Sequence, residues 1–438
     1  MNTRQTLGLM LVLSIFPGFL ITGLAQNDTV SLRNKIEQLE QALAKAKADL
    51  AQAETSLRNA NDTGPDKITI GDFKIGGAVR VNWAIGTYET GEGPTRGAKG
   101  GNFALDTFRV NIDYAHQNLI GKFEYRFMNG YSFLHTGWLG YDFADGNQIQ
   151  VGVNRVPFGP GPYGISNSWF FDQHYYVGLS DDMDLGIKYT RHLDDVTMDL
   201  AYYFSDEGNW LGSSNDSARY GYDPVVWEYD TDGDGVSEVT GYGERNQINF
   251  RLIRHFRAIA TDVGFSLQYN QLEGRHADDG SMYATSIHLK KDFGKLSVNT
   301  QLSYYNHDVG ALPTGDDETI VYGAWDFAWP IAAEAMIPAV GISYYIPTTQ
   351  LDWLDAVTLY AEYSSIIKTG TTASGEDFED SNLYVIGSSF WRGGWFIYLD
   401  VAFSDGNFFV GGDHFNDFGP NTGSKMQSRV NLNLGYYF

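Results

Sequence analysis

The last ten residues of the chain, 429–438, alternate between apolar side chains and polar or small ones. Val430, Leu432, Leu434, Tyr436 and Phe438 form the apolar set. A period of two places the two sets on opposite faces of a β-strand. A half-buried strand of a soluble sandwich shows the same pattern. The other segments therefore decide whether the apolar face meets lipid or a protein core.

The same alternation recurs along residues 67–438 and predicts sixteen strands. They span Phe73–Tyr88, Thr107–Ala115, Lys122–Phe127, Leu134–Phe143, Gln148–Val156, Leu185–Arg191, Val196–Phe204, Gln247–Ile253, Val263–Leu272, Met282–Lys290, Leu296–Tyr305, Pro338–Ile346, Val357–Ile366, Asn382–Phe390, Trp395–Phe403 and Arg429–Phe438.

Short turns and long loops alternate between these strands, as they do in outer-membrane barrels. A soluble sandwich has no reason to sort its loops by length. We therefore predict an all-β transmembrane fold, a 16-stranded antiparallel outer-membrane β-barrel. The even count places both termini on the short-turn, periplasmic side. It also assigns Thr319–Phe327, which itself resembles a strand, to a long external loop.

The N-terminus predicts a signal peptide and a coiled coil ahead of the barrel. Residues 1–25 combine Arg4, an apolar run and small residues before Ala25, as secretory signals do. In residues 26–66, apolar side chains recur at spacings of four and three, which is the heptad pattern of a periplasmic coiled coil. Those side chains are Leu32, Ile36, Leu39, Leu43, Ala46, Leu50, Ala53, Leu57 and Ala60. The alternative is a single amphipathic helix lying on the barrel mouth or on peptidoglycan.

Composition agrees with an aromatic-rich barrel in residues 67–438. The chain has 50 Gly, 28 Tyr, 27 Phe and 10 Trp, and its mean hydropathy is negative. A net charge of −24 argues against nucleic-acid binding, because backbone phosphates would repel so acidic a protein. The sequence contains no Cys, which excludes disulfides and thiolate chemistry.

Basic residues outnumber acidic ones on the lumen-facing phase of the predicted strands. The basic set is Lys74, Arg80, Arg109, Lys122, Arg126, Lys188, Arg251, Lys290 and Arg429. The acidic set is Asp113, Glu124, Asp199, Glu362 and Asp400. A pore lined in this way concentrates anions. The alternative is that these charges pair with one another and fix the barrel's shape.

One segment gives a family resemblance. Residues 151–159, Val-Gly-Val-Asn-Arg-Val-Pro-Phe-Gly, lead into a long third loop and resemble a segment of the phosphate-selective porin O/P family. Residues 71–80 and 341–347 resemble an early and a late strand of that family. The resemblance implies a homotrimeric porin whose third loop folds into the lumen, with anion selectivity carried by basic side chains.

The predicted third loop, Pro157–Asp182, is aromatic and contains no Lys or Arg. Its candidate constriction residues are Phe158, Tyr163, Trp169, Phe170 and Tyr175. Aromatic faces can guide sugars or small organic acids through a narrow passage. The alternative is that these rings pack the loop against the inner wall.

A second candidate site is an acidic turn in the fourth loop. Asp230, Asp232, Asp234, Val236 and Glu238 occupy positions 1, 3, 5, 7 and 9 of a calcium loop, with Gly235 at position 6. Position 12 is Gly241, so the EF-hand pattern is incomplete. The turn either binds Ca²⁺ or remains an unliganded acidic turn.

These patterns predict a passive diffusion channel in the outer membrane of a Gram-negative cell, with its N-terminal helix in the periplasm. No catalytic motif is present, so we expect no enzymatic activity and no required cofactor. The expected partners are membrane lipid and lipopolysaccharide, further copies of the chain, and small anions or other hydrophilic solutes. The alternatives are a cell-envelope tether or adhesin with a plugged barrel, and a sugar or organic-acid porin.

Deletion of residues 28–60 tests the coiled coil. Loss of the heptad seam is expected to reduce the proportion of trimers, which sedimentation of the detergent-solubilised protein measures. Exchanging the flanking charges Lys35 and Glu40 for Gln, which leaves the apolar seam intact, should preserve the oligomer. An unchanged trimer after the deletion would show that the segment does not join the chains.

Overall fold

The structure is a computed structural model. It describes residues 67–87, 101–143, 146–214, 216–229, 238–310, 317–348, 351, 353–411 and 415–438, with the side chains of Tyr229 and Glu238 left out. The predicted signal peptide and coiled coil lie outside the described residues. Within those ranges, no helix is long and apolar enough to cross a membrane.

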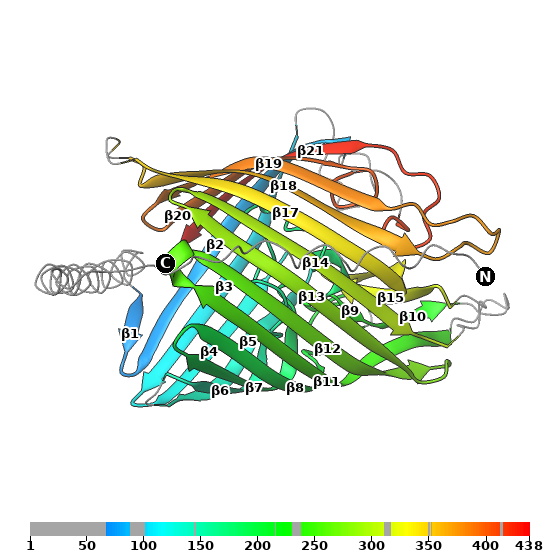
Figure 1. Cartoon of the computed structure of the whole chain (residues 1–438), viewed down its shortest axis with the longest axis horizontal. Coiled ribbons are helices and arrows are strands. Elements are labelled where there is room, and N and C mark those ends of the chain that lie inside the picture. The colour runs from blue at the N-terminus through cyan, green and yellow to red at the C-terminus, as the bar shows by residue number, and fades with distance from the viewer. Residues whose placement is uncertain are drawn as a thin grey trace, which may run out of the picture. The chain divides into compact units, whose positions relative to one another are not determined.

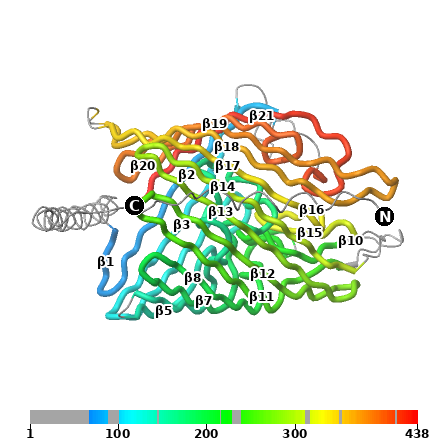
Figure 2. The backbone as a smooth tube through the Cα atoms, viewed as in Figure 1, coloured from blue at the N-terminus to red at the C-terminus, as the bar shows by residue number. Residues whose placement is uncertain are grey.

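Sixteen strands of the described residues form a closed antiparallel barrel, as the alternation predicts (Figures 1 and 2). They are β2 (Phe73–Gly86), β3 (Asn102–His116), β4 (Leu119–Phe127), β5 (Ser132–Asp142), β6 (Gln148–Arg155), β7 (Met183–Leu193), β8 (Val196–Asp206), β11 (Glu238–Phe256), β12 (Thr261–Arg275), β13 (Gly280–Phe293), β14 (Leu296–Asp308), β17 (Glu334–Pro347), β18 (Ala356–Thr369), β19 (Ser381–Arg392), β20 (Trp395–Ser404) and β21 (Gln427–Tyr437). The first and last of these pair from Ala78↔Tyr437 to Gly86↔Arg429 and close the barrel.

Two short strands extend the barrel sheet at its ends. β1 (Ile68–Ile70) pairs with β2, and β10 (Val226–Tyr229) pairs with β11. Two 3₁₀ turns, η2 (Tyr175–Val177) and η3 (Arg257–Ile259), are also present.

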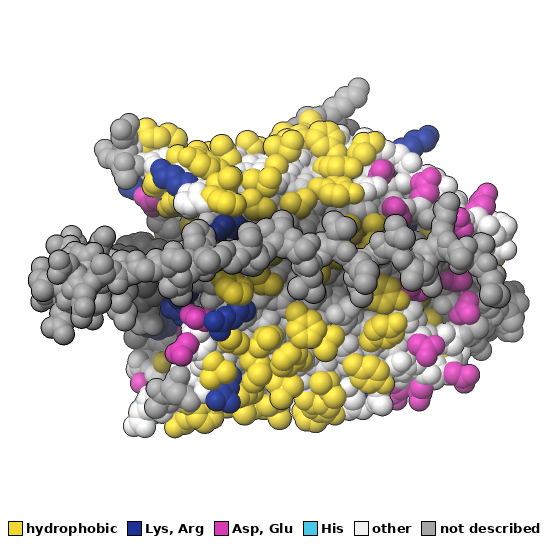
Figure 3. All heavy atoms as spheres, in the orientation of Figure 1, with side chains coloured by type: hydrophobic (Ala, Val, Ile, Leu, Met, Phe, Trp, Pro, Cys, Tyr) yellow, Lys and Arg dark blue, Asp and Glu magenta, His cyan; other side chains and the backbone are white. Residues whose placement is uncertain are grey.

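The outer surface carries a band of apolar side chains. Leu139, Ile287 and Ile386 are 68%, 59% and 62% exposed, while Arg429, Asn431 and Asn433 of β21 face inward and are buried. Figure 3 shows this band between an end that carries both basic and acidic side chains and an end on which Asp and Glu side chains predominate. An apolar belt of this kind is the surface that a barrel presents to hydrocarbon.

Thr319–Phe327 is not part of the barrel sheet, as the even strand count requires. Its residues form β15 (Thr319–Ala324), which pairs with β16 (Phe327–Ala332) and with β9 (Asp223–Pro224) in a separate three-stranded sheet. The sorting of loops by length is less complete than predicted. Residues 128–131 and 276–279 connect strands at the long-loop end and are short.

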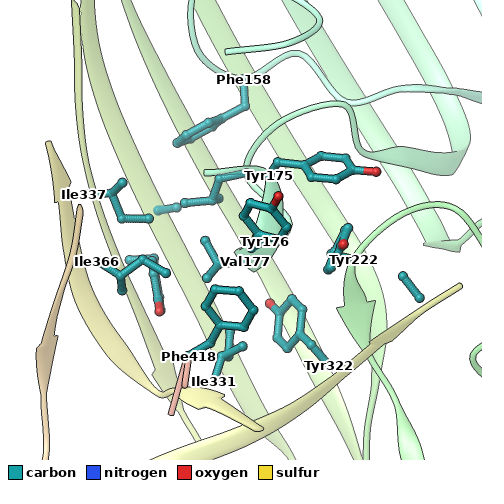
Figure 4. Close-up of a cluster of buried hydrophobic side chains, with 14 of the residues drawn as sticks. Phe158, Tyr175, Tyr176, Val177, Tyr222, Tyr322, Ile331, Ile337, Ile366 and Phe418 are labelled. Atoms are coloured by element: carbon teal, nitrogen blue, oxygen red, sulfur yellow. The ribbon is translucent and has the colours of Figure 1, made fainter. Parts of the chain in front are cut away.

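Four long connections pack against one another through buried aromatic side chains. We name them L3 (157–182), L4 (207–237), L6 (309–333) and L8 (405–426). Their shared cluster includes Tyr176, Tyr222, Tyr322, Trp329 and Phe418, and these are 4% exposed or less. Figure 4 shows that this cluster reaches Ile337 and Ile366 of the wall strands β17 and β18. The loops therefore fill part of the barrel interior.

An Arg placed on the apolar belt tests the membrane boundary. Ile287→Arg, at the middle of β13, is expected to lower the free energy of unfolding by about 2–4 kcal/mol, because the charge would lie in hydrocarbon. Phe293→Arg, at the end of the same strand, is the matched control, with an expected cost of about 0–1 kcal/mol. Denaturant unfolding in lipid vesicles measures both. Equal costs would contradict this placement of the belt.

Candidate functional site

L3 crosses the barrel interior, and its backbone is held by side chains of the wall. The N–H groups of Gly159 and Gln173 donate to Ser266 Oγ of β12 and Ser364 Oγ of β18, at 3.1 and 3.0 Å. Trp169 N–H donates to an Asp400 carboxylate oxygen of β20 at 3.1 Å. Because these strands lie far from β6 and β7, where L3 begins and ends, the loop must span the lumen.

Glu362 of β18 is the second carboxylate that holds L3. It accepts from Ser166 Oγ at 2.6 Å and from the backbone N–H of Asn167. Glu362 is 7% exposed and Asp400 is fully buried. Sequence phase identifies both as lumen-facing acids, but their role as acceptors for loop N–H groups depends on the loop's path.

A buried Ser–His–Asp chain provides another anchor. Ser303 Oγ lies 2.9 Å from His174 Nε2, and His174 Nδ1 lies 2.8 Å from Asp172 Oδ1. These contacts match the connectivity of a hydrolase triad. All three residues are at most 1% exposed, and the cavity described below is not lined by any of them. These hydrogen-bonded side chains therefore join L3 to β14, and the buried Ser303 has no access to a substrate.

A cavity of about 370 Å³, the arginine cavity, separates L3 from the wall formed by β2–β4 and β18–β21. It is lined by Arg80, Asp106, Arg109, Arg126, Met128, Phe133, Tyr163, Ser166, Asn167, Ser168, Trp169, Phe171, Asp181, Tyr220, Trp325, Thr358, Ser389, Trp391, Phe396, Tyr398 and Tyr437. Guanidinium groups and aromatic rings thus face one another where the third loop narrows the lumen.

Carboxylates accompany the arginines of this cavity. Arg80 pairs with Asp106 at 2.8 Å, whereas Arg109 and Arg126 share Glu124 at 3.2 and 2.7 Å. The predicted alternative, in which the lumen charges pair with one another, therefore holds for these residues. Sharing one carboxylate between two guanidiniums still leaves the group positive.

A fourth guanidinium, that of Arg155, lies beside the cavity, whose lining includes its partner Asp181. Arg155, at the end of β6, pairs with Asp181 at 2.6 Å, and Tyr220 also donates its hydroxyl to Asp181. Burial and the neighbouring Asp181 raise the pKa of Tyr220 above its usual range, so its hydroxyl stays protonated. Four guanidiniums, those of Arg80, Arg109, Arg126 and Arg155, then face three carboxylates.

Aromatic rings cover several of these cations. Arg126 lies 4.4 Å from the centroid of the Tyr220 ring, and Arg109 lies 5.0 Å from that of Tyr437. Arg155 lies 5.5 Å from the Tyr163 ring. These cation–π contacts orient the guanidinium planes.

The other predicted pore-lining residues lie elsewhere on the inner wall. Arg251 pairs with Asp199 at 2.7 Å, and Lys188 donates to the Arg155 carbonyl at 2.7 Å. Arg429 is buried, donates to the Phe409 carbonyl and lies over the Trp169 ring. Lys74, Lys122 and Lys290 are exposed and do not line the arginine cavity.

The predicted constriction aromatics divide into two groups. Phe158, Phe170 and Tyr175 are 4%, 1% and 1% exposed and pack the loop, which is the alternative considered from sequence. Tyr163 and Trp169 line the arginine cavity. The predicted calcium turn, Asp230 to Glu238, lies outside the described residues apart from the Glu238 backbone.

Sequence analysis missed Asp106 and Arg155. The pairing of β2 with β3 shifts register between Arg80 and Val81, where Leu105 follows Thr107 in the register and Asp106 is the extra residue of a bulge. A bulge reverses strand phase and turns Asp106 toward Arg80. Arg155 is the last residue of β6, where the alternation no longer predicts whether a side chain faces the lumen or the lipid. Tyr220 and Trp325 come from loops, so period-two patterns carry no signal for them.

Comparison with known proteins finds similarity in structure alone. No protein-family model matches the chain, and no curated protein matches it. The outer-membrane channel DcaP of Acinetobacter baumannii is similar over 85% of this chain and 100% of its own, with 13% identity and a TM-score of 0.55. The trimer form of OmpT, an outer membrane protein of Vibrio cholerae, is similar over 84% and 99%, with 14% identity and a TM-score of 0.52.

Salmonella typhi OmpF, solved in complex with daunomycin, is similar over 84% of this chain and 97% of its own, with 10% identity and a TM-score of 0.50. At these identities the likeness shows the fold alone, that of an outer-membrane β-barrel.

Glu362→Ala tests the anchoring of L3. Loss of this buried acceptor leaves the Asn167 N–H without its partner, so its hydrogen exchange is expected to accelerate by roughly tenfold or more. Glu334→Ala on β17 removes a carboxylate that accepts from Tyr304 rather than from L3, and should leave this exchange unchanged. Equal protection of Asn167 in both variants would contradict the anchor.

Proposed function

We propose that the chain is a passive diffusion channel of the outer membrane, selective for small hydrophilic solutes and preferring anions. The observation that carries this proposal is the arginine cavity, which Arg80, Arg109 and Arg126 line where L3 crosses the lumen. With Arg155 beside the cavity, four guanidiniums pair with three carboxylates, those of Asp106, Glu124 and Asp181. The apolar belt of the barrel and its porin-like fold support the location. No bond is made or broken in this function.

Selection acts through charge and size together. An excess positive charge inside a low-dielectric wall attracts anions and repels cations. The space between L3 and the wall limits what can pass. Tyr163, Trp169 and Tyr398 add aromatic faces to the cavity, which suits organic acids better than inorganic ions. This chemistry and the resemblance of residues 151–159 support a preference for anions without favouring phosphate.

The remaining partners follow from the same proposal. The apolar belt contacts membrane lipid, and the acidic end faces the lipopolysaccharide side. A homotrimer joined by the heptad segment of residues 26–66 completes the assembly.

A second candidate, a plugged barrel that serves as a structural tether or adhesin, is favoured by a different observation. The side chains of L3, L4, L6 and L8 form a continuous buried cluster inside the barrel. If this cluster seals the lumen, the arginine cavity ends blindly. Electrical recording separates the two candidates.

Planar-bilayer recording of the purified protein is expected to give channels with an anion-selective reversal potential in a salt gradient. Arg109→Gln should lower the anion-to-cation permeability ratio by about twofold or more, because it removes the excess positive charge and leaves the Arg126–Glu124 pair. Asp106→Asn should raise the ratio. Arg392→Gln, at the exposed end of β19, is the matched control and should not change it.

If the purified protein gives no conductance in planar bilayers, the channel proposal is wrong and the plugged barrel is favoured. Cation preference would overturn the anion selectivity alone.

A further inference from the structure

A group of buried carboxylates lies where L3 and L4 meet the barrel wall, outside the lining of the arginine cavity. Asp182 ends L3, Asp184 belongs to β7, and Asp223 belongs to β9 in L4. One carboxylate oxygen from each lies within 4.8 Å of those of the other two. All three side chains are at most 4% exposed.

Two further acids make the charge of this group strongly negative. Glu207 and Glu244 are 5% and 4% exposed and act electrostatically on Asp182. Arg219 lies among them, but it binds Asp223 at 3.1 Å and Asp206 at 2.7 Å. One guanidinium cannot balance five buried carboxylates.

Unpartnered oxygens point to a ligand in the group. Glu244 Oε1 and Asp184 Oδ1 are buried and accept no hydrogen bond. Glu244 comes from β11, is not one of the three clustered aspartates and lies against Asp184. The other Asp184 oxygen accepts from Gln247 Nε2 at 2.6 Å, so the side chain is held in place while Oδ1 stays free. A fixed, buried carboxylate oxygen without a donor is positioned to bind a cation.

The carboxylates also converge on a space kept open by a glycine. A Cβ atom at Gly221 would lie 2.7 Å from Asp182 Oδ1, 3.1 Å from Glu207 Oε1 and 3.2 Å from Asp223 Oδ2. Any other residue at this position would push these oxygens apart. Three side chains from L3, β9 and the start of L4 thus turn toward one region of space.

We propose that Asp182, Asp184 and Asp223 bind a divalent cation of the calcium class, with Glu244 as a fourth ligand. Calcium prefers oxygen ligands and tolerates irregular geometry. Oxygens bound at about 2.4 Å to one ion are at most about 4.8 Å apart, which agrees with the observed spacing. The ion joins the end of L3 and the middle of L4 to β7 and β11 of the wall. This proposal does not depend on whether the barrel conducts.

Calcium titration of the full-length protein in detergent, after chelator treatment, tests the site by calorimetry. Asp182→Asn and Asp184→Asn are each expected to weaken Ca²⁺ binding by at least tenfold. Asp326→Asn is the matched control, because Asp326 also joins two loops, through Ser213 and Ser214, but lies outside the group. A background carrying Asp230→Asn, Asp232→Asn and Asp234→Asn removes the acidic turn predicted from sequence.

The proposal requires that binding persist in that background and be lost on adding Asp182→Asn. Calcium should also raise the melting temperature of the background protein and of its Asp326→Asn form, but not of its Asp182→Asn form. Binding that disappears in the background alone would overturn the proposal, as would equal binding in all variants. The absence of any calcium binding would overturn it too, and would indicate that the carboxyl groups hold protons instead. Asp182→Asn leaves the Gln247 contact intact and serves if Asp184→Asn does not fold.

Discussion

Every other feature of this barrel depends on the pairing of β2 with β21. Backbone N–H and C=O groups in hydrocarbon have no water to bind, so a sheet in the membrane must close on itself. The pairing from Ala78↔Tyr437 to Gly86↔Arg429 removes both edges of the sheet and turns alternate side chains toward an enclosed interior. Enclosure then determines which contacts form inside, because the loops that enter the barrel must find hydrogen-bond partners on its wall. The charges there must likewise be paired, covered by rings or supplied with an ion.

The interior contains two charged groups of opposite sign. Around the arginine cavity, guanidiniums exceed carboxylates by one, and aromatic rings cover several of them. Near Asp184, buried carboxylates outnumber the single guanidinium of Arg219. The first group fits a passing anion, and the second fits a resident cation. The two are joined along the chain, since Asp181 pairs with Arg155 while the adjacent Asp182 belongs to the acidic group.

Alternation along the sequence predicted the barrel well, because a strand between lipid and lumen must repeat every two residues. It also identified Arg80, Arg109 and Arg126, and the strand parity kept Thr319–Phe327 out of the wall. Alternation could not predict the bulges. The extra residue at Asp106 reverses the strand phase locally, and nothing in the composition of the segment indicates it. The inward path of L4, L6 and L8 was also beyond it, because contacts such as Tyr176 with Phe418 join residues far apart in the chain. The acidic group near Asp184 combines β7, β9 and β11 for the same reason.

Much of the path of L3 is fixed by contacts of its backbone and does not depend on which side chains the loop carries at these positions. Gly159, Asn167, Trp169 and Gln173 are held through their backbone N–H groups, and the acceptors are wall side chains. Gly159 is also constrained by space, because a Cβ atom there would lie 2.8 Å from Gln301 Nε2, and the buried Gln173 side chain donates to the Ser381 carbonyl. Side chains that line the arginine cavity, such as Tyr163 and Trp169, can therefore be exchanged without removing an anchor. The side-chain anchors, Ser166 on Glu362 and His174 on Ser303, must stay, but the residues between them can vary. Natural variation and protein engineering thus have a route to new solute preferences on an unchanged barrel.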